Sequence, residues 1–437
     1  MAHKELHFNL DERFVFDSKT KQKLFIAIGI GILLFVLGLV LSGSGEHAQH
    51  ALASAEHGAT AAGHESHGSS VLVKRIFAAL WFNNVFFVGI SVIGLFFIAY
   101  NYVAWAGWSA SIIRIPMAMP SFLIPGAILM AVVFALGMHD IFHWTHSDLF
   151  DKSSPHYDKI IAGKSWYLNL PFYIARTLLF FGAWILIWNV IKKFSLKQDL
   201  DATNAVKYHD KIIWFSALFL VVFGVSSSMS AWDWSMSIDT HWFSTMFGWY
   251  HLASWHVSGL ATILLIVLFL KDSGYLPMVN DNHLHDLGKF IFAFSIFWTY
   301  VWFGQFILIF YANISEETTY FLDRLVRFDN LYTPFFILNL IINFCFPFLL
   351  LMSRNAKRQP LILKIAASAI VFGHWIDFFL MQQPGILKGD GGFGFIEIGV
   401  GVVYASLFAL VVLNALSKMP LIAKNHPMLE ESIHHNI

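Results

Sequence analysis

Apolar residues run along this chain in ten long stretches separated by short polar segments. A helix needs about 20 apolar residues to cross a bilayer, and a window of about 19 residues finds each stretch long enough. The polar start of mixed charge is unlike a cleavable signal peptide, so the first stretch is expected to be retained. The predicted spans are 24–41, 77–103, 118–138, 168–191, 212–230, 242–270, 288–313, 331–352, 361–381 and 395–417.

The spans predict an all-α polytopic membrane protein with about ten transmembrane helices. Two four-helix bundles are expected, flanked by one helix at each end of the chain. The expected divisions are a cytoplasmic N-terminal tail (1–23), the first transmembrane helix (24–41), a His/Gly/Ala-rich outer loop (42–76), the first four-helix bundle (77–230), an interfacial loop with the second four-helix bundle (231–381), and the last helix with a cytoplasmic tail (382–437).

The loop after the first span contains five histidines and is otherwise rich in Gly, Ala and Ser. Such a composition favours a flexible polar loop with nothing to bury. A metal-binding tract is the alternative interpretation. The five histidines are His47, His50, His57, His64 and His67.

Basic residues are distributed unequally between the two sets of connecting segments. If the N-terminus lies inside, the inside segments hold about 19 of the 28 Lys and Arg residues and the outside loops about 8. Cytoplasmic loops carry such an excess. The sequence therefore predicts that both termini are cytoplasmic.

Composition excludes several functional classes. Of the residues, 57% are apolar and only 13% charged, and the formal net charge is zero, so nucleic acid is not an expected partner. The single cysteine, Cys345, cannot form an internal disulfide or hold an iron–sulfur cluster with cysteine ligands. The Cys-x-x-Cys-His signature of covalent haem and the paired histidines of bis-haem cytochromes are both missing. The chain is expected to bind an apolar redox carrier, to move protons, or to do both beside a redox partner.

Ionisable side chains in membrane spans are costly and are functional candidates by default. His139, Asp140, His143 and His146 end the third span at the predicted outer face. The three histidines are expected to share one helical face, where they could bind a metal, handle protons or a quinol, or only bond to water. Asp140 is a candidate partner for Arg176 of the fourth span, in a structural salt bridge or in a ligand site.

Three further histidines and an aspartate lie deeper in the predicted membrane. His251 and His256 are five residues apart, so they are expected to point to different sides and act separately. His374 and Asp377 are three apart and share a face. The pair could relay protons or could simply hold two helices together.

The segment from Asp233 to Gly248, DWSMSIDTHWFSTMFG, resembles a motif of the large membrane subunits of alternative complex III, a quinol:cytochrome c (or other electron carrier) oxidoreductase. The family motif reads Asp-x-x-Met-Ser-Leu-Asp/Glu-Pro-x-Trp-Tyr/Phe-Ser-Thr-x-Phe/Tyr-Gly, and here Thr240 stands where proline is usual. The ten-span layout is similar to the wider group of polysulfide-reductase-like (NrfD) membrane anchors. The matching positions are Asp233, Met236, Ser237, Asp239, Trp242, Phe243, Ser244, Thr245 and Gly248.

The short tail, the His-rich loop and the length make the chain more similar to the ActF-type subunit than to its ActC-type paralogue. The resemblance implies a bacterial inner-membrane subunit that works beside the ActC-type paralogue, an iron–sulfur subunit, c-type cytochromes and a possible terminal oxidase. It also implies a proton route and a possible menaquinol or other quinol site, with no electron-carrying cofactor of the chain's own. The quinone-binding candidates are His139, Asp140, Arg176, Asp233 and Asp239, and the proton-transfer candidates are His143, His241, His251, His256, His374 and Asp377.

Two other functional classes fit a ten-span chain. A secondary transporter would show Gly- or Pro-broken spans in matching halves, which Pro334 and Pro347 alone do not supply. A structural membrane anchor would need no ligand at all.

Overall fold

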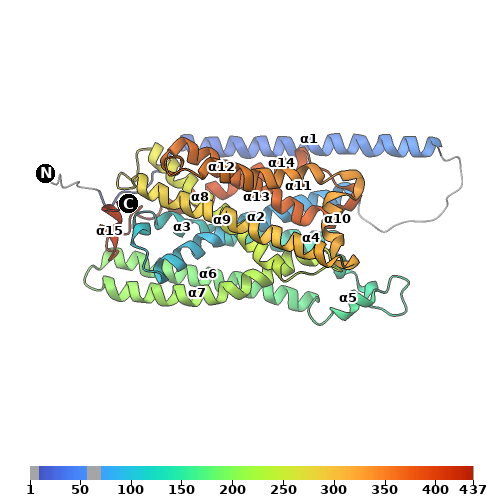
Figure 1. Ribbon diagram of the computed structural model, residues 1–437, viewed down its shortest axis with the longest axis horizontal. Coiled ribbons are helices and arrows are strands. Elements are labelled where there is room, and N and C mark those ends of the chain that lie inside the picture. The colour runs from blue at the N-terminus through green and yellow to red at the C-terminus, as the bar shows by residue number, and fades with distance from the viewer. Residues whose placement is uncertain (1–8, 57–69, 437) are drawn as a thin grey trace.

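The computed structural model describes residues 9–56 and 70–436. Within these residues, ten helical segments are long and apolar enough to cross a membrane, and the prediction of an all-α polytopic membrane protein is confirmed (Figure 1). The membrane helices are α1 (Ser18–Glu56), α2 (Val71–Val103), α4 (Leu123–Ile141), α6 (Leu170–Leu200), α7 (Ala205–Trp234), α8 (Met246–Asp272), α9 (Asp281–Ala312), α11 (Thr333–Leu340) continued by α12 (Phe346–Leu351), α13 (Pro360–Leu387) and α14 (Phe395–Leu416). Shorter helices are α3 (Arg114–Ala118), α5 (Lys159–Gly163), α10 (Ser315–Leu325) and α15 (Leu429–Ile433).

Several helices extend beyond their apolar stretches. α1 begins six residues before the predicted span and runs to Glu56, so part of the expected outer loop is helical. The histidines His57, His64 and His67 of that loop lie outside the described residues. Polar side chains fix other helix starts: Ser70 caps α2, Asn169 caps α6 and Asn280 caps α9 by accepting backbone N–H bonds.

Helix α2 forms the centre of the molecule. In the most apolar 18-residue stretch of α2, 94% of the stretch is buried inside the protein, whereas for α1 the share is 11%. α2, α4, α6 and α7 contact one another in a ring, and α8, α9, α11–α12 and α13 form a second ring. α2 also contacts α8 and α13, so the two four-helix groups share a broad interface.

The two flanking helices pack against each other rather than on opposite sides of the molecule. α1 lies along α14 at the periphery (Figure 1). Glycine makes this close approach possible, because a Cβ at Gly399 would lie only 2.5 Å from the backbone nitrogen of Phe35. Small residues of this kind are typical of membrane helix pairs.

The molecule has two distinct ends. The terminal end holds Arg13 and Pro420, which form an isolated antiparallel β-bridge, together with α15. The loop end holds α5 and α10 (Figure 1). The described chain therefore begins and finishes at the same end of the helix bundle.

Candidate functional site

Two adjoining cavities form one cleft at the loop end. The first, of about 270 Å³, lies among the ends of α2, α4 and α13, and the second, of about 380 Å³, extends to α10. His143, Ile238, Gly385 and Lys388 line both, and we call the combined space the loop-end cleft. The polar residues that line only one of the cavities are Lys74, His139, Asp140, His146 and Asp390 in the first, and Asp239, Thr240, His241, Trp242, Thr319, Tyr320 and Asp323 in the second.

The three histidines after α4 gather in the cleft, but not as a helical stripe. α4 ends at Ile141, and the extended backbone of Phe142 turns the chain before His143, so the predicted shared helical face is wrong. The rings still lie close, with centroids 5.1 Å apart for His139 and His146 and 5.9 Å for His143 and His146. Partial burial, and then the neighbouring His146, lowers the pKa of His143 and favours its neutral form. Among the residues described, no three metal-ligating side chains converge on a common point.

Arg176 pairs with Asp233 and not with the candidate partner Asp140. Its Nε and Nη2 donate to the two carboxylate oxygens of Asp233 at 2.7 and 2.9 Å, and Nη1 donates to the carbonyl oxygen of Tyr167 at 3.1 Å. Both charged side chains are buried. Of the five quinone-binding candidates, His139, Asp140 and Asp239 therefore line the loop-end cleft. Arg176 and Asp233 form a separate buried ion pair.

Asp239 connects the cleft to the interior through Arg324 of α10. Nη2 of Arg324 donates to Asp239 at 3.2 Å, and its Nε donates to the carbonyl oxygen of Leu380 at 2.7 Å. Pro384, which has no N–H, cannot donate to that carbonyl, so Arg324 replaces the missing helical bond. α13 continues through Pro384 to Leu387, beyond the predicted end of this span at residue 381. Burial raises the pKa of the Asp239 carboxyl, and Arg324 beside it opposes the shift.

A small cavity lies beyond Arg324, toward the membrane interior. Its volume of about 10 Å³ is close to the space of one water molecule. Tyr320 lines both this cavity and the cleft, so it is a residue that the two spaces share. The other polar residues around the small cavity are Tyr250, Trp302, Gln305, Arg324 and Asn339.

Asp377 lies directly behind this small cavity and is fully buried. The hydroxyl of Tyr250 donates to one carboxylate oxygen, and Asn339 Nδ2 donates to the same oxygen at 2.8 Å. Trp298 Nε1 donates to the other oxygen at 3.0 Å. Three donors from three different helices thus surround one carboxyl group in the middle of the second four-helix group.

His374 extends these contacts further along the helix bundle. Its Nδ1 lies 3.7 Å from an oxygen of Asp377 and 3.0 Å from the hydroxyl oxygen of Ser254. The predicted shared face of His374 and Asp377 is confirmed. Ser258 and Thr262 follow at intervals of four on α8, each donating to the carbonyl one turn back. The polar chain, defined as Asp239, Arg324, Tyr320, Tyr250, Asp377, His374 and Ser254, thus leads from the loop-end cleft to the bundle interior.

A π-helical segment, Ile341–Cys345, follows α11 and carries Asn343 beside the polar chain. The segment lies just before Pro347, and the N–H of Phe346 donates five residues back, to the carbonyl of Ile341. Asn343 Nδ2 donates to Asn339 Oδ1 at 2.5 Å, and Asn339 in turn donates to Asp377. A Cβ at Gly373 would lie 2.2 Å from Asn343 Oδ1, so only glycine permits this approach.

The remaining histidine candidates occupy three separate places. His251 Nε2 lies 3.1 Å from the hydroxyl oxygen of Ser235, whereas His256 lies against Phe294 with no hydrogen-bond partner for either ring nitrogen among the described residues. Their different directions agree with the prediction. His241 is half exposed in the loop-end cleft and its Nε2 bonds to Asp158 at 2.6 Å.

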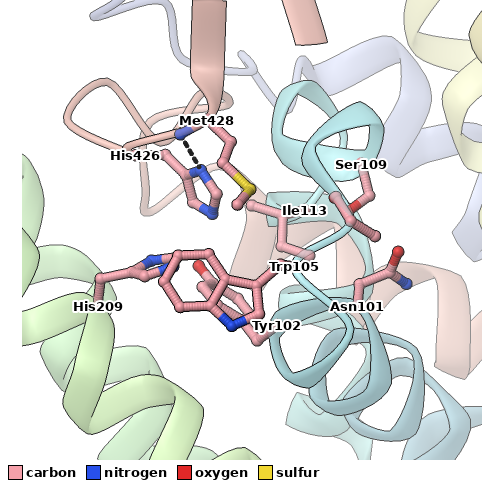
Figure 2. A pocket seen from close by; sticks show the side chains of 9 residues that line it. Asn101, Tyr102, Trp105, Ser109, Ile113, His209, His426 and Met428 are labelled. Atoms are coloured by element: carbon pink, nitrogen blue, oxygen red, sulfur yellow. Dashed lines mark hydrogen bonds between the residues drawn. The ribbon is translucent and has the colours of Figure 1, made fainter. Parts of the chain in front are cut away.

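A second histidine pair lies at the terminal end, where the sequence singled out no candidate. His209 of α7 and His426 of the C-terminal segment face each other across a small pocket beside Tyr102 and Trp105 (Figure 2). Their ring centroids are 5.0 Å apart, and the backbone N–H of Met428 donates to His426 Nδ1 at 3.2 Å. Because that nitrogen accepts a hydrogen bond, the proton of neutral His426 belongs on Nε2.

Sequence reasoning missed Tyr250, Trp298 and Arg324. Tyrosine and tryptophan are frequent in this chain, and nothing in the order of residues distinguishes these two. Arg324 lies in a short polar helix between spans, where an arginine is unremarkable. Its proximity to Pro384, sixty residues later, exists only in the folded chain.

The fold and the site define the class of this protein as a polytopic α-helical membrane protein with a buried polar chain that starts at a cleft on one face. A scan against protein-family models matches no family, and a search of curated proteins finds no relative.

Proposed function

We propose that this chain is an ActF-type membrane subunit of an alternative complex III, a respiratory quinol:electron carrier oxidoreductase, and that its own chemistry is proton transfer. The observation that carries the proposal is the buried carboxyl of Asp377, joined to the loop-end cleft by the polar chain. The motif from Asp233 to Gly248 supports the assignment to this complex. The chain is expected in a bacterial inner membrane with both termini cytoplasmic.

The polar chain has the chemistry that a proton route requires. Carboxyl, phenol, imidazole and hydroxyl groups can each both accept and release a proton, and the small cavity has room for a bridging water. Arginine does not give up its proton, so Arg324 is a positioning residue that holds Asp239 and α13. The step assigned to this route is transfer of a proton between Asp377 and the cleft through Tyr250 and Tyr320.

Quinol binding is the second part of the proposal. The cavity of about 270 Å³ presents His139 and Asp140. A quinol hydroxyl must release its proton as its electrons leave, and a nearby imidazole or carboxylate can accept it. The electrons would pass to partner chains, for which we propose the ActC-type paralogue, an iron–sulfur subunit and c-type cytochromes.

The test uses the intact complex, purified through a tag on this chain and reconstituted in vesicles. We expect multihaem and iron–sulfur chains to co-purify. Asp377→Asn keeps the shape but cannot ionise, so we expect proton movement per electron to fall while quinol oxidation is retained. Asp272→Asn is the matched control, because Asp272 is exposed and bonds only to Lys364 in the described structure.

The alternatives give different results. A protein that purifies alone and moves a solute would be a secondary transporter. If Asp377→Asn impairs only assembly, and the assembled fraction keeps an unchanged proton-to-electron ratio, the chain is a structural anchor. The quinol step is tested separately by His139→Ala and Asp140→Asn, and unchanged turnover with unchanged inhibitor affinity would contradict it.

A further inference from the structure

A second cleft opens on the side of the molecule between α2, α13 and α14. Its volume of about 420 Å³ falls in the range of small-molecule sites, about 300–1,000 Å³. The walls are aromatic and aliphatic, and of the described residues that line it Ser368 is the one with a hydroxyl group. Representative lining residues are Phe86, Phe372, Trp375, Phe393, Val402 and Ala405. We call this space the side cleft.

The side cleft runs along the helices and therefore along the membrane normal. On α13 its lining extends from Ser368 to Trp375, and on α14 from Ile398 to Ala405. Seven residues of helix span about 10 Å, so the lining covers about two thirds of one half of the hydrocarbon core, which is about 15 Å thick. The surrounding helices are all membrane spans. A group that fills this cleft must therefore be hydrocarbon for most of its length.

A cationic group lies beside the loop end of the side cleft. Phe393 lines this end. The guanidinium of Arg75 lies against Gly392 and Gly394, the two neighbours of Phe393, and is 3.3 Å from the position that a Cβ would take at Gly394. Arg75 donates through Nε and Nη2 to the buried carboxylate of Glu397, at 2.7 and 2.8 Å, and its side chain is 17% exposed. The guanidinium is thus held in a fixed place at the membrane surface. Arginine in such a place suits a phosphodiester oxygen.

We propose that the side cleft is a binding site for one phospholipid, with an acyl chain between α13 and α14 and the phosphodiester at Arg75. A quinone fits less well, because its ring oxygens need polar partners within the cleft. The indole N–H of Trp375 already donates to Asn83 Oδ1 at 2.7 Å, and Ser368 lies at the end far from Arg75. None of the residues that line this site belongs to the polar chain, and the site does not depend on the proposed function.

The test fills the cleft from the lipid side. Ala405→Phe places a ring in the side cleft from an exposed position of α14, and Ala217→Phe, at an exposed position of α7, is the matched control. The protein is purified in mild detergent with any partner chains that stay bound, and its phospholipid is counted by native mass spectrometry. Spin-labelled phosphatidylglycerol is then added, and the immobilised fraction is measured.

We expect the wild-type protein and Ala217→Phe to retain one phospholipid more than Ala405→Phe, and to immobilise correspondingly more spin-labelled lipid. Ser368→Phe fills the same end of the cleft from α13 and should give the same loss, so a folding defect of one variant does not decide the result. Equal lipid counts in all four proteins would refute the site. Loss of an isoprenoid quinone instead of phospholipid, or a cross-link from this cleft to a helix of a partner chain, would equally refute the phospholipid.

Discussion

At the scale of single residues, each buried arginine in the membrane region has a specific acceptor. Arg176 bonds to Asp233, Arg114 to Asp199 and Arg324 to Asp239. An isolated charge in a low-dielectric interior is costly, so each pair is stable only as long as both members remain. This explains why these arginines can lie inside the bundle without being ligand-binding groups.

The Arg176–Asp233 pair gives a direct stability prediction. Arg176→Ala leaves a buried carboxylate without its partner, and we expect a loss of about 3–5 kcal/mol in the free energy of unfolding. The double variant Arg176→Met with Asp233→Leu should recover most of this loss. SDS-induced unfolding in mixed micelles measures both.

The control for this prediction is an exposed pair. Lys364→Ala removes the partner of Asp272 at the protein surface, where an ion pair contributes about 0–1 kcal/mol. A loss for Arg176→Ala no larger than that for Lys364→Ala would contradict the structural role of the buried pair.

At the scale of elements, irregular helices supply the polar chain. The π-helical segment before Pro347 places Asn343 against Asn339, which bonds to Asp377, and Pro384 leaves the carbonyl of Leu380 free to accept a hydrogen bond from Arg324. Both irregularities occur where a proline removes a backbone donor. In regular helices the side chains of Asn343 and Arg324 would not find these hydrogen-bond partners.

The close approach of α13 to the π-helical segment can be tested at Gly373. Gly373→Ala introduces a Cβ only 2.2 Å from Asn343 Oδ1, so Asn343 must move. We expect a loss of about 1–3 kcal/mol in unfolding free energy from overpacking, together with weaker proton transfer. Gly182→Ala of α6 meets no atom within 4 Å and should be neutral or slightly stabilising. Equal thermal unfolding midpoints for the two variants would contradict the predicted clash.

The C-terminal segment 417–436 should dock more weakly in acid. Burial, and then His209 and Arg114, lowers the pKa of His426 to about 3. Free imidazole titrates near pH 6.5, so below about that pH the undocked segment binds a proton that the docked one excludes. Docking is therefore strongest above about pH 6.5 and weakens as the pH falls toward 3.

Hydrogen exchange of this segment, corrected for the intrinsic rate at each pH, measures the effect. The exchange protection of segment 417–436 should fall between about pH 7.5 and pH 5. His426→Gln cannot titrate and should reduce that pH dependence, whereas His434→Gln, at an exposed position of the same segment, should not. The prediction fails if all three proteins respond equally to pH.

At the scale of the whole molecule, the two clefts belong to different environments. The loop-end cleft opens at one end of the bundle beside charged residues, and the side cleft lies among membrane helices. The ten spans place the described chain ends together at the terminal end. The distribution of basic residues between the two sets of loops predicts that the terminal end faces the cytoplasm.

The orientation can be measured with reporter fusions. We expect a green fluorescent protein joined at the C-terminus to fluoresce, because that end is predicted to be cytoplasmic. Alkaline phosphatase inserted in the segment 151–156, at the loop end, should be active only if that end lies outside. The opposite pattern at both positions would reverse the orientation and place the loop-end cleft inside.

The sequence by itself determined the class of fold, because each span carries its own apolar signal of sufficient length. It also located His374 beside Asp377, since residues three apart share a helical face. Only the tertiary structure decided the partners: Arg176 with Asp233, Arg324 with Asp239, and Tyr250 with Asp377 are 57, 85 and 127 residues apart in sequence. Such contacts depend on which helices pack together and on where prolines distort them. The sequence shows where the prolines are but not which helices pack together or which side chain meets a freed carbonyl, so the polar chain became visible only in the folded protein.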